Sequence, residues 1–395
     1  MFNKKNLLHT FILVITFFVV FGTGFFVGKN SKVCRTCMPE SVDFSLFWDA
    51  YDKLHENFIE PDKINEQNII YGAISGMTKS LGDPYTDFFD PEQAKMFKQD
   101  LAGSFEGIGI EVGIKKERIT VIAPLKGTPG DRAGLKSGDQ IIAINGQNTY
   151  NMSIEEAVNI IRGKKGTKVT LTIFREDWKD VKDIEIIRGT IKVDAVKWNL
   201  KNDDVAHIQI RQFDQSLSPD FKKIAFEILK SPAKKIILDL RDNPGGYLEV
   251  SQDVAGWFLK NGQVVAIQDF GKDRDQKEYK VSGNEAFVDY PIVVMINNGS
   301  ASASEILAGS LRDNRKINLI GEKSFGKGSV QEAVSLRDGK SFLKITKSKW
   351  LVPSGSSISE VGLSPDVKIE MTSEDFESGK DPQLEKALEI IKNLK

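Results

Sequence analysis

Three serines alternate with alanines in the stretch NNGSASASEIL, and this spacing is the first feature of the sequence that points to chemistry. Ser300, Ser302 and Ser304 follow an apolar run that ends at Ile296, and they precede a segment with a helical pattern. Small residues at such a junction let the backbone turn sharply and leave a hydroxyl accessible. One of these serines is therefore a candidate nucleophile, which needs a neighbouring base to take its proton.

Two side-chain types can act as that base. The histidines are His9, His55 and His207, and none stands in a loop with turn signals nearby, although a Ser-His-Asp triad assembled from distant segments stays open. Lysine can act as base once it is desolvated, because burial disfavours its charged form. Lys327 lies between two glycines, which allow close packing around the amine. Gln331 lies four residues on, one turn away if the segment is helical, and its amide oxygen could orient that amine.

The stretch LDLRDNPGGYLEV, residues 238–250, is the candidate source of an oxyanion hole. It is predicted to form a strand, a tight Asn-Pro-Gly-Gly turn and a helix, so that backbone N–H groups at Gly245 and Gly246 are exposed beside a helix N-terminus. Such donors must be in place before negative charge develops on the substrate. The N–H of Ala303, which follows Ser302, is the second candidate donor. A tight turn without a catalytic role is the alternative interpretation.

Length and composition set the frame for these motifs. The 395 residues suffice for two or three domains, and 40% hydrophobic with 28% charged residues is ordinary for a globular protein. A net charge of −1 gives no indication of a nucleic-acid partner. Cys34 and Cys37 form a lone C-x-x-C that is interpreted as a linker feature, with a local disulfide or an interchain crosslink as alternatives.

Residues 7–28 are almost wholly apolar and long enough to span a bilayer as a helix. No small-residue cleavage site follows, so an uncleaved signal anchor is predicted rather than a signal peptide. The predicted organisation is a cytoplasmic tip and transmembrane anchor at 1–28, a linker at 29–40 and a helical N-terminal domain at 41–102. The expected localisation is the cell membrane, single-pass, with the remainder of the chain outside the cytoplasm. Basic residues flank the span on both sides and do not settle its orientation.

Residues 103–190 alternate short apolar runs with Gly and Asp turns. Strands are predicted at 109–114, 119–123, 140–144 and 168–174. A helix is predicted to follow Ser153, an N-cap residue with Glu156 at the capping-box spacing, and to reach Ile161. The stretch PGDRAGLKSGDQIIAINGQ is the most specific part of a segment that resembles a PDZ domain over its whole length.

The PDZ resemblance implies a site for a peptide. GIGI takes the place of the carboxylate-binding loop, so Gly107, Ile108, Gly109 and Ile110 are the expected substrate-binding residues. Arg162 follows the helix and could reach a peptide or the next domain. A scaffolding domain without a bound peptide is the alternative.

From residue 191 to 395 a further domain is predicted, in which apolar strand-length runs such as KKIILDL and YPIVVMIN alternate with helical patterns. This alternation is typical of an α/β unit with crossover connections. The last segment, DPQLEKALEIIKNL, is predicted to be an amphipathic helix.

Five motifs in register complete a resemblance to the carboxyl-terminal processing proteases, which are Ser-Lys peptidases with an embedded PDZ domain. They are GDPYTDFFDPEQ, ILDLRDNPGG, NNGSASASEILAGSLRDN, GEKSFGKGSVQ and PSGSSISEVGLSPDV, with the PDZ stretch between the first two. The resemblance implies a crotonase- or ClpP-like protease core that needs no metal or cofactor. It also implies Ser302 as nucleophile, Lys327 as base, Gln331 as its support, and Ala303 with Gly246 rather than Gly245 as oxyanion donors. The chain departs from the family pattern at ITKSKWLVPSG, where Thr-Thr-Ala-Arg-Tyr-Tyr is common, so the resemblance implies no substrate-groove residues in this stretch.

The expected function is therefore a serine endopeptidase that holds protein C-termini in its PDZ domain and cleaves substrates through an acyl-enzyme. Its expected partners are peptides or proteins with free C-termini, the membrane, and a homo-oligomeric or regulatory partner. A membrane-tethered PDZ adaptor without activity and a crotonase-like acyl-CoA enzyme are the competing interpretations. A peptidase held inactive until a partner docks is a third.

Overall fold

The computed structural model describes residues 16–21, 42–115, 118–176, 178–272 and 274–394. The chain divides into two compact units, Met1–Ile70 and Tyr71–Lys395. The first contains a helical stretch at 16–21, the helix α2 (Ser45–Asn57) and the short helix η1 (Pro61–Lys63). The helix α3 (Glu66–Lys79) begins in the first unit and ends in the second.

The predicted membrane anchor is corrected by the structure. In the described part of the chain, no helix is both long and apolar enough to cross a membrane. Only 16–21 of the predicted span 7–28 is described, and the rest of it, with the predicted linker 29–40 and its two cysteines, lies outside the described residues. Since a spanning helix needs about 20 apolar residues, the described stretch does not support a transmembrane segment. The predicted membrane localisation and membrane partner are unsupported for the same reason.

The β-rich part of the second unit comprises residues 104–192. Its larger sheet has the order β3-β4-β5-β7-β8, with β6 paired to β5, and a two-stranded sheet of β2 and β9 joins the two ends of the segment. The strands are β2 (Ser104–Gly107), β3 (Ile110–Lys115), β4 (Arg118–Pro124), β5 (Gln140–Ile144), β6 (Gln147–Asn148), β7 (Lys168–Phe174), β8 (Lys182–Ile187) and β9 (Gly189–Lys192).

Two helices, α5 (Pro129–Arg132) and α6 (Ile154–Ile161), complete this part. The predicted capping box at the start of α6 is confirmed, because the N–H of Glu156 donates to Ser153 Oγ at 3.1 Å and the N–H of Ser153 donates to Glu156 Oε2 at 2.8 Å. Strands β5 and β7 have the predicted bounds. Apolar side chains of the sheet and of α6 fill one core, which includes Ile108 and Ile161.

The α/β part of the second unit is built on a six-stranded sheet of order β10-β11-β12-β15-β16-β19. All neighbours are parallel except β10 and β11. The strands are β10 (Val196–Lys201), β11 (Val205–Ile210), β12 (Lys235–Asp239), β15 (Ile292–Ile296), β16 (Leu319–Gly321) and β19 (Val367–Lys368). The helices are α7 (Leu217–Lys230), α8 (Leu248–Ala255), α9 (Ala303–Arg315), α10 (Ser373–Ser378) and α11 (Pro382–Asn393).

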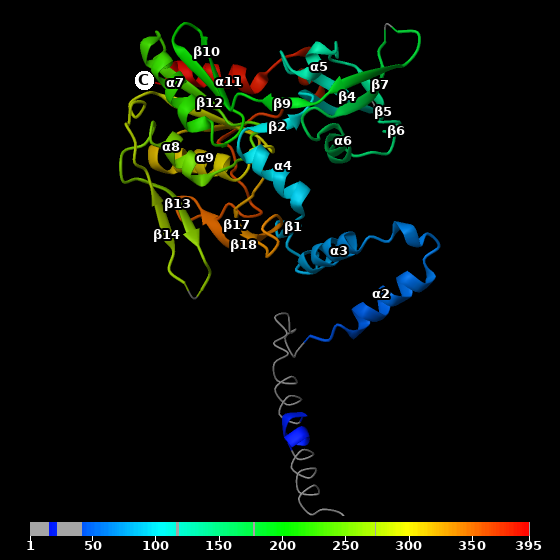
Figure 1. The fold of residues 1–395 in the computed structure, drawn as a ribbon. Helices are drawn as coiled ribbons and strands as arrows, with labels where there is room; N and C mark the ends of the chain where they lie inside the picture. Colours follow the sequence, from blue (N-terminus) through cyan, green and yellow to red (C-terminus); the bar gives the residue numbers. More distant parts are fainter. Residues whose placement is uncertain (1–15, 22–41, 116–117, 177, 273, 395) are drawn as a thin grey trace, which may run out of the picture. The chain divides into compact units, whose positions relative to one another are not determined.

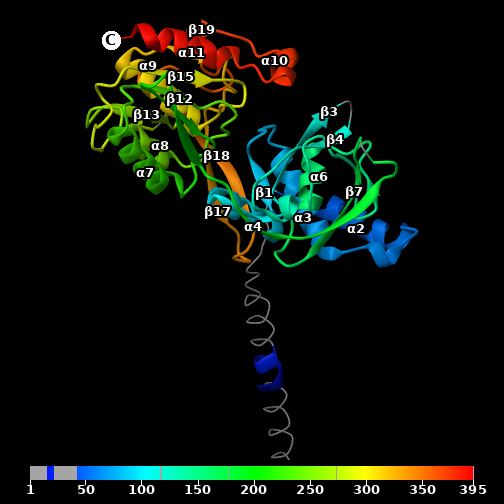
Figure 2. The same ribbon diagram turned by 90° about the horizontal axis from the view of Figure 1, so that it is seen from above.

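Both faces of this sheet are covered (Figures 1 and 2). Ile236, Leu238 and Val294 belong to the core shared with α7, α8 and α9, whereas Ile237 and Val293 belong to the core shared with α11. Successive strand residues point to opposite faces, so a strand covered on both sides must be apolar at every position. This explains the unbroken apolar runs that the sequence shows here.

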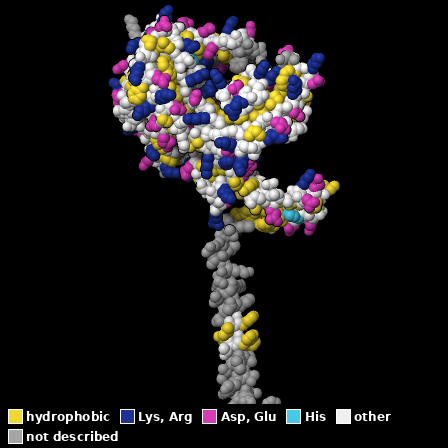
Figure 3. Space-filling model, turned by 45° about the horizontal axis from the view of Figure 1, so that its top comes forward, with side chains coloured by type: hydrophobic (Ala, Val, Ile, Leu, Met, Phe, Trp, Pro, Cys, Tyr) yellow, Lys and Arg dark blue, Asp and Glu magenta, His cyan; other side chains and the backbone are white. Residues whose placement is uncertain are grey.

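A second, antiparallel sheet flanks the α/β part. Its strands are β1 (Asp87–Phe89), β13 (Val264–Asp269), β14 (Lys277–Lys280), β17 (Ser329–Ser335) and β18 (Phe342–Leu351). Strand β1 comes from the GDPYTDFFDP segment and pairs with β18, with Asp87 opposite Lys344. The helix α4 (Pro91–Leu101) then leads from β1 to β2. A segment far upstream in the sequence is thus placed beside the loop that carries Lys327. On the face that Figure 3 shows, acidic and basic side chains are interspersed among the described residues.

Candidate active site

The serine-rich segment forms the turn between β15 and α9. Ser302 is the residue before α9 and has φ 56° and ψ −116°, a conformation that residues with a side chain rarely adopt. Ser300 and Ser304 are fully buried, and their hydroxyls donate to the carbonyls of Leu240 (2.7 Å) and Asn243 (2.9 Å). The Ser302 hydroxyl is partly exposed and donates to no group among the described residues. The three serines are therefore not equivalent: of the three, Ser302 is the one that is partly exposed and whose hydroxyl donates to no described group.

The Gly245–Gly246 turn packs directly against Ser302. A Cβ on Gly245 would lie 2.6 Å from the carbonyl oxygen of Ala301, 2.8 Å from Ser302 Cβ and 2.9 Å from the nitrogen of Ala303. Gly245 also has φ 97°, so both space and backbone conformation require glycine there. Across the described residues, the N–H groups of Gly246 and Ala303 have no acceptor. Two backbone donors without an acceptor among the described residues therefore lie here, one in the glycine turn and one directly after Ser302.

A completely buried carboxylate, Glu305, joins the serine turn to the lysine loop. Its Oε2 accepts the N–H of Ser302 (2.8 Å) and of Lys327 (3.0 Å). Its Oε1 accepts Ser324 Oγ (2.6 Å) and the N–H of Gly326 (2.8 Å). Burial raises the pKa of Glu305, while the four donors act in the opposite direction and favour the carboxylate. The sequence analysis missed this residue, although a Glu at the third position of a predicted helix is the capping-box signal.

Lys327 lies in the loop that leads into β17, and its side chain is half-buried. Burial lowers the pKa of its amine, the nearby Lys344 lowers it further, and Glu305 opposes both. The amine makes no hydrogen bond or ion pair with any residue that the structure describes. Its Nζ lies 5.9 Å from the ring centroid of Tyr85, a residue of the GDPYTDFF segment that sequence reasoning did not select.

Gln331 is not one helical turn from Lys327, because the segment is the strand β17. That condition of the prediction is wrong, and the reason is the pairing of β17 with β18, which places Gln331 opposite Thr346. Gln331 Nε2 donates to Ser329 Oγ (2.6 Å) and to Thr346 Oγ1 (3.4 Å). Within the described residues, no hydrogen bond joins Gln331 to Lys327.

His207, the alternative base, belongs to a different network. Its Nε2 lies 3.1 Å from Asp239 Oδ2, and both side chains are buried. Arg241 pairs with Asp239 (2.8 Å) and with Asp381 at the start of α11 (2.9 Å). Burial acts to raise the pKa of Asp239, but the hydrogen bonds from His207 and Arg241 outweigh it and hold that pKa far below its usual range. In the described structure the His207 ring has no serine among its hydrogen-bond partners, so this network ties the sheet to α11.

The predicted peptide-binding residues line a groove of about 180 Å³ between β3 and α6. Ile108, Gly109, Ile110 and Arg162 contribute to it, whereas Gly107 lies in β2, paired with Gly189, and is outside the lining. The N–H groups of Ile108 and Gly109 have no acceptor in the described part of the chain. The remaining lining residues are Phe105, Val112, Ile154, Val158 and Ile161. An apolar groove with free N–H groups at one end suits a peptide that ends in a carboxylate.

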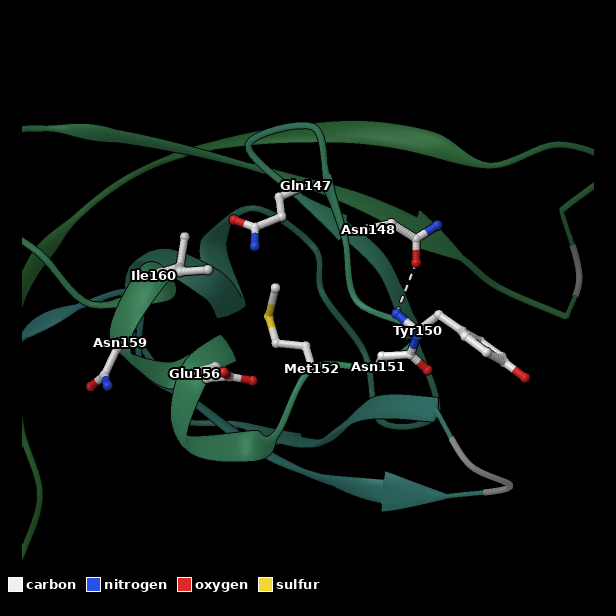
Figure 4. A pocket seen from close by; sticks show the side chains of 8 residues that line it. All are labelled: Gln147, Asn148, Tyr150, Asn151, Met152, Glu156, Asn159 and Ile160. Carbon is white, nitrogen blue, oxygen red and sulfur yellow. Dashed lines mark hydrogen bonds between the residues drawn. The ribbon is translucent and has the colours of Figure 1, made fainter. Parts of the chain in front are cut away.

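A second hollow, of about 790 Å³, lies on another face of α6. Figure 4 shows its lining, in which the thioether of Met152 stands between the amide of Gln147 and the helix, and Tyr150 stands at one end. None of the predicted site residues lines this hollow. The other lining residues are Asn148, Asn151, Glu156, Asn159 and Ile160.

The fold defines a class of protein: an α/β core of the kind found in serine peptidases, with a PDZ-like β-rich part ahead of it in the chain. Comparisons with known proteins agree with this class. Models of peptidase family S41, the PDZ domain and the activating protease CtpB N-terminal domain match residues 204–369, 93–174 and 29–93.

Known proteins are similar in sequence to this chain over most of its length. The carboxy-terminal processing protease CtpA of Bacillus subtilis is 37% identical over 370 residues, 93% of this chain and 78% of that protein. CtpB of the same organism is 36% identical over 349 residues, 87% of this chain and 71% of CtpB. The solved photosystem II D1 C-terminal processing protease is 26% identical, with a TM-score of 0.54 over 83% of this chain and 89% of that one. The chain belongs to the carboxy-terminal processing proteases of peptidase family S41.

The predicted family and the predicted enzyme class are thereby confirmed: the protein is a PDZ-containing C-terminal processing serine peptidase. Its two domains fit peptide substrates. The competing interpretations, an inactive PDZ adaptor and an acyl-CoA enzyme, are not favoured.

Proposed function

We propose that Ser302 is the nucleophile and Lys327 the general base of this peptidase. The observation that carries the proposal is the difference among the three serines: the hydroxyls of Ser300 and Ser304 donate to the carbonyls of Leu240 and Asn243, whereas Ser302 is partly exposed and its hydroxyl donates to no described group. The bonds of Glu305 to the N–H groups of Ser302 and Lys327 support the pairing, because one side chain holds both backbones. The lowered pKa of Lys327 supports its role, since only a neutral amine can accept a proton.

The proposed reaction begins when Ser302 Oγ attacks the carbonyl carbon of the scissile peptide and its proton passes to the neutral amine of Lys327. The N–H groups of Ala303 and Gly246 are the proposed donors to the oxyanion that forms. The ammonium of Lys327 then returns the proton to the leaving nitrogen, the C–N bond breaks, and an acyl-enzyme remains. Lys327 next takes a proton from water, whose oxygen attacks the ester carbonyl carbon. The ester C–O bond then breaks, the ammonium of Lys327 returns that proton to Ser302 Oγ, and the free hydroxyl and neutral amine are restored.

Gln331 is the proposed orienting partner of that amine. Its Nε2 is already engaged by Ser329 and Thr346, so its oxygen is the atom left to accept from Lys327 when the two approach. This role requires the side chains of Lys327 and Gln331 to approach each other, because the described structure contains no hydrogen bond between them.

The PDZ groove is proposed to hold the free C-terminus of the substrate. The carboxylate would bind the N–H groups of Ile108 and Gly109, and an apolar last side chain would enter between Ile110 and Ile161. Arg162, whose guanidinium lies 4.5 Å from the Phe105 ring centroid, stands at the end of this groove. The proposed domains are a helical segment at 41–102, the PDZ domain at 103–190 and the protease core at 191–395.

The test is digestion of an unstructured protein that ends in a free apolar residue, compared with the same protein amidated at its C-terminus. Wild type should cleave the free form faster, and Ser302→Ala should cleave neither. Equal rates on both forms would contradict the role of the PDZ groove, whereas activity in Ser302→Ala would contradict the nucleophile.

A further inference from the structure

Strand β18 brings a second lysine, Lys344, to the site of Lys327. Lys344 lies opposite Asp87 of β1 and opposite Ala333 of β17, so it stands in the middle of the sheet, between two strands. Its side chain is half-buried, and its Nζ lies 4.9 Å from the ring centroid of Phe89. Two residues further along β18, on the same face, is Thr346, which accepts the hydrogen bond of Gln331. Lys344 therefore lies on the face of β18 that carries the acceptor of Gln331, and its charge acts on the Lys327 amine.

The β1 segment borders both amines. Tyr85 contacts Lys327, and Asp87, two residues later, is the register partner of Lys344. Neither amine has an ion-pair partner within the described residues, so neither positive charge is cancelled by a direct contact. Two ammonium groups in one half-buried site would repel each other, and one of them must give up its proton more readily.

The surrounding charges decide which amine stays protonated. Burial lowers the pKa of the Lys344 amine, and the carboxylates of Asp87 and Asp83 oppose that effect and favour its charged form. Burial lowers the pKa of Lys327, and among the described residues Glu305 is the one carboxylate that opposes this effect; it is already shared among four donors. The ring of Tyr85, which lies near the Lys327 amine, carries no carboxylate that could pair with it. Lys344 is thus the amine better able to keep its proton.

We propose that Lys344 is a positioning residue that acts through Lys327: its ammonium repels a second positive charge and so keeps Lys327 in the neutral form that accepts the Ser302 proton. This inference rests on the proposed function of Lys327. An amine activated by a neighbouring cationic group is an established way of obtaining a lysine that is reactive at neutral pH. No covalent step by Lys344 is involved.

Loss of the Lys344 charge should raise the pH at which Lys327 becomes neutral by roughly one unit, the size of effect expected from a neighbouring like charge in a half-buried site. In Lys344→Met, kcat/KM at neutral pH should therefore fall about tenfold. At alkaline pH, where Lys327 is neutral in both proteins, the two rates should converge. Lys344→Arg, which keeps the charge, should follow the wild-type profile.

The experiment is the pH profile of kcat/KM for these full-length proteins, with Lys347→Met as the matched control. Lys347 lies on the same strand and is exposed, and its Nζ pairs with Glu332 at 2.7 Å, so its removal changes the net charge equally without touching the cluster. Lys344→Gln covers the case in which methionine disturbs the strand. If Lys344→Met lowers the alkaline plateau of kcat/KM but leaves the midpoint of the pH profile unchanged, the proposal is overturned. That result would show that Lys344 contacts the substrate or serves in packing. A displaced midpoint in Lys344→Arg would also overturn the proposal.

A direct titration separates this inference from the proposed function. In Ser302→Ala protein labelled at lysine Cε, the Lys327 signal is assigned by its loss in Lys327→Arg, and its NMR titration midpoint is measured with and without Lys344→Met. A midpoint raised by about one pH unit supports the proposal, and an unchanged midpoint overturns it. Full activity of Lys327→Arg would instead contradict the proposed base, whatever the titration shows.

Discussion

The serine turn and the lysine loop are held in different ways. Ser302 stands between β15, which is wholly buried, and α9, whose first nine residues are buried. Lys327 lies in a half-buried loop, its amine bonded to no described residue, ahead of a strand at the side of the core. The nucleophile therefore lies on packed elements. The backbone of the lysine loop is held by Glu305, but the amine of Lys327 has no hydrogen-bond partner among the described residues. Displacing the Lys327 amine therefore costs less free energy than displacing Ser302, because movement of the serine would disturb the packed core. Regulation of the activity is expected to act on the lysine.

Among the proposed substitutions, the greatest loss of kcat/KM is expected at Ser302. Ser302→Ala should reduce kcat/KM by about four orders of magnitude or more, since loss of a nucleophile removes the covalent pathway. Its melting temperature should stay near that of wild type, because a partly exposed hydroxyl that donates to no described residue is lost. Ser304→Ala is the matched control: it should cost about 1 kcal/mol of stability through its lost hydrogen bond to Asn243 and keep most activity. Equal losses in both variants would contradict the assignment.

The second prediction concerns Lys327, the proposed base. Lys327→Arg should be inactive, because guanidinium keeps its proton at any working pH. In wild type kcat/KM should rise with pH through one ionisation whose midpoint lies below the ordinary lysine value of about 10.4. The sign follows from the active form: burial and Lys344 lower the pKa of Lys327, and the neutral amine accumulates above that pKa. His207→Gln should leave the midpoint unchanged. A midpoint that disappears in His207→Gln would show that histidine is the base.

A third prediction concerns Glu305, which connects the serine turn to the lysine loop. Glu305→Gln keeps the size of the side chain but turns an NH₂ group toward one pair of its four donors. The serine turn and the lysine loop should then separate slightly, and kcat/KM should fall about a hundredfold, as small misplacements of reacting groups do. Glu332→Gln, an exposed carboxylate on β17, serves as control and should match wild type. Wild-type kinetics in Glu305→Gln would show that the two regions hold their positions independently.

The last prediction concerns hydrogen exchange in the wild-type protein, which measures how easily each of the two regions opens. Hydrogen exchange should be slowest in peptides from 303–311 and about tenfold or more faster in peptides from 323–331, because local opening is easier where fewer groups are buried. Mass spectrometry of the exchanged protein measures both regions at once. A C-terminal peptide bound in the PDZ groove should slow exchange in 323–331 more than in 303–311 if the groove acts on the base. Equal protection of both regions in the free protein would remove the proposed difference.

Much of the architecture followed from local signals. Continuous apolar runs at 236–238 and 292–296 indicated strands of an α/β unit, and the structure then shows helices on both faces of β12 and β15. Ser153 and Glu156 marked the start of α6 because a capping box needs only residues three apart. The order of the motifs was enough for the family. Each of these signals depends on neighbours in the sequence or on a pattern along it.

Other features depended on contacts between distant segments. The three serines look alike in the sequence, and only the carbonyls of Leu240 and Asn243 distinguish Ser302 from the other two. Gln331 was expected on a helix, but its pairing partner β18, which no local pattern specifies, makes its segment a strand. The predicted membrane anchor found no support in the described helices.

The sequence by itself determined the family, the order of the domains, the buried strands and the residue types that could react. The tertiary structure decided which serine hydroxyl donates to no described group, that Glu305 joins the serine turn to the lysine loop, and that Lys344 and Tyr85 surround the proposed base. The physical reason is that reactivity depends on burial, charge and hydrogen bonding at short range in space. Those quantities are set by segments that the chain brings together from far apart, such as β1 and β18.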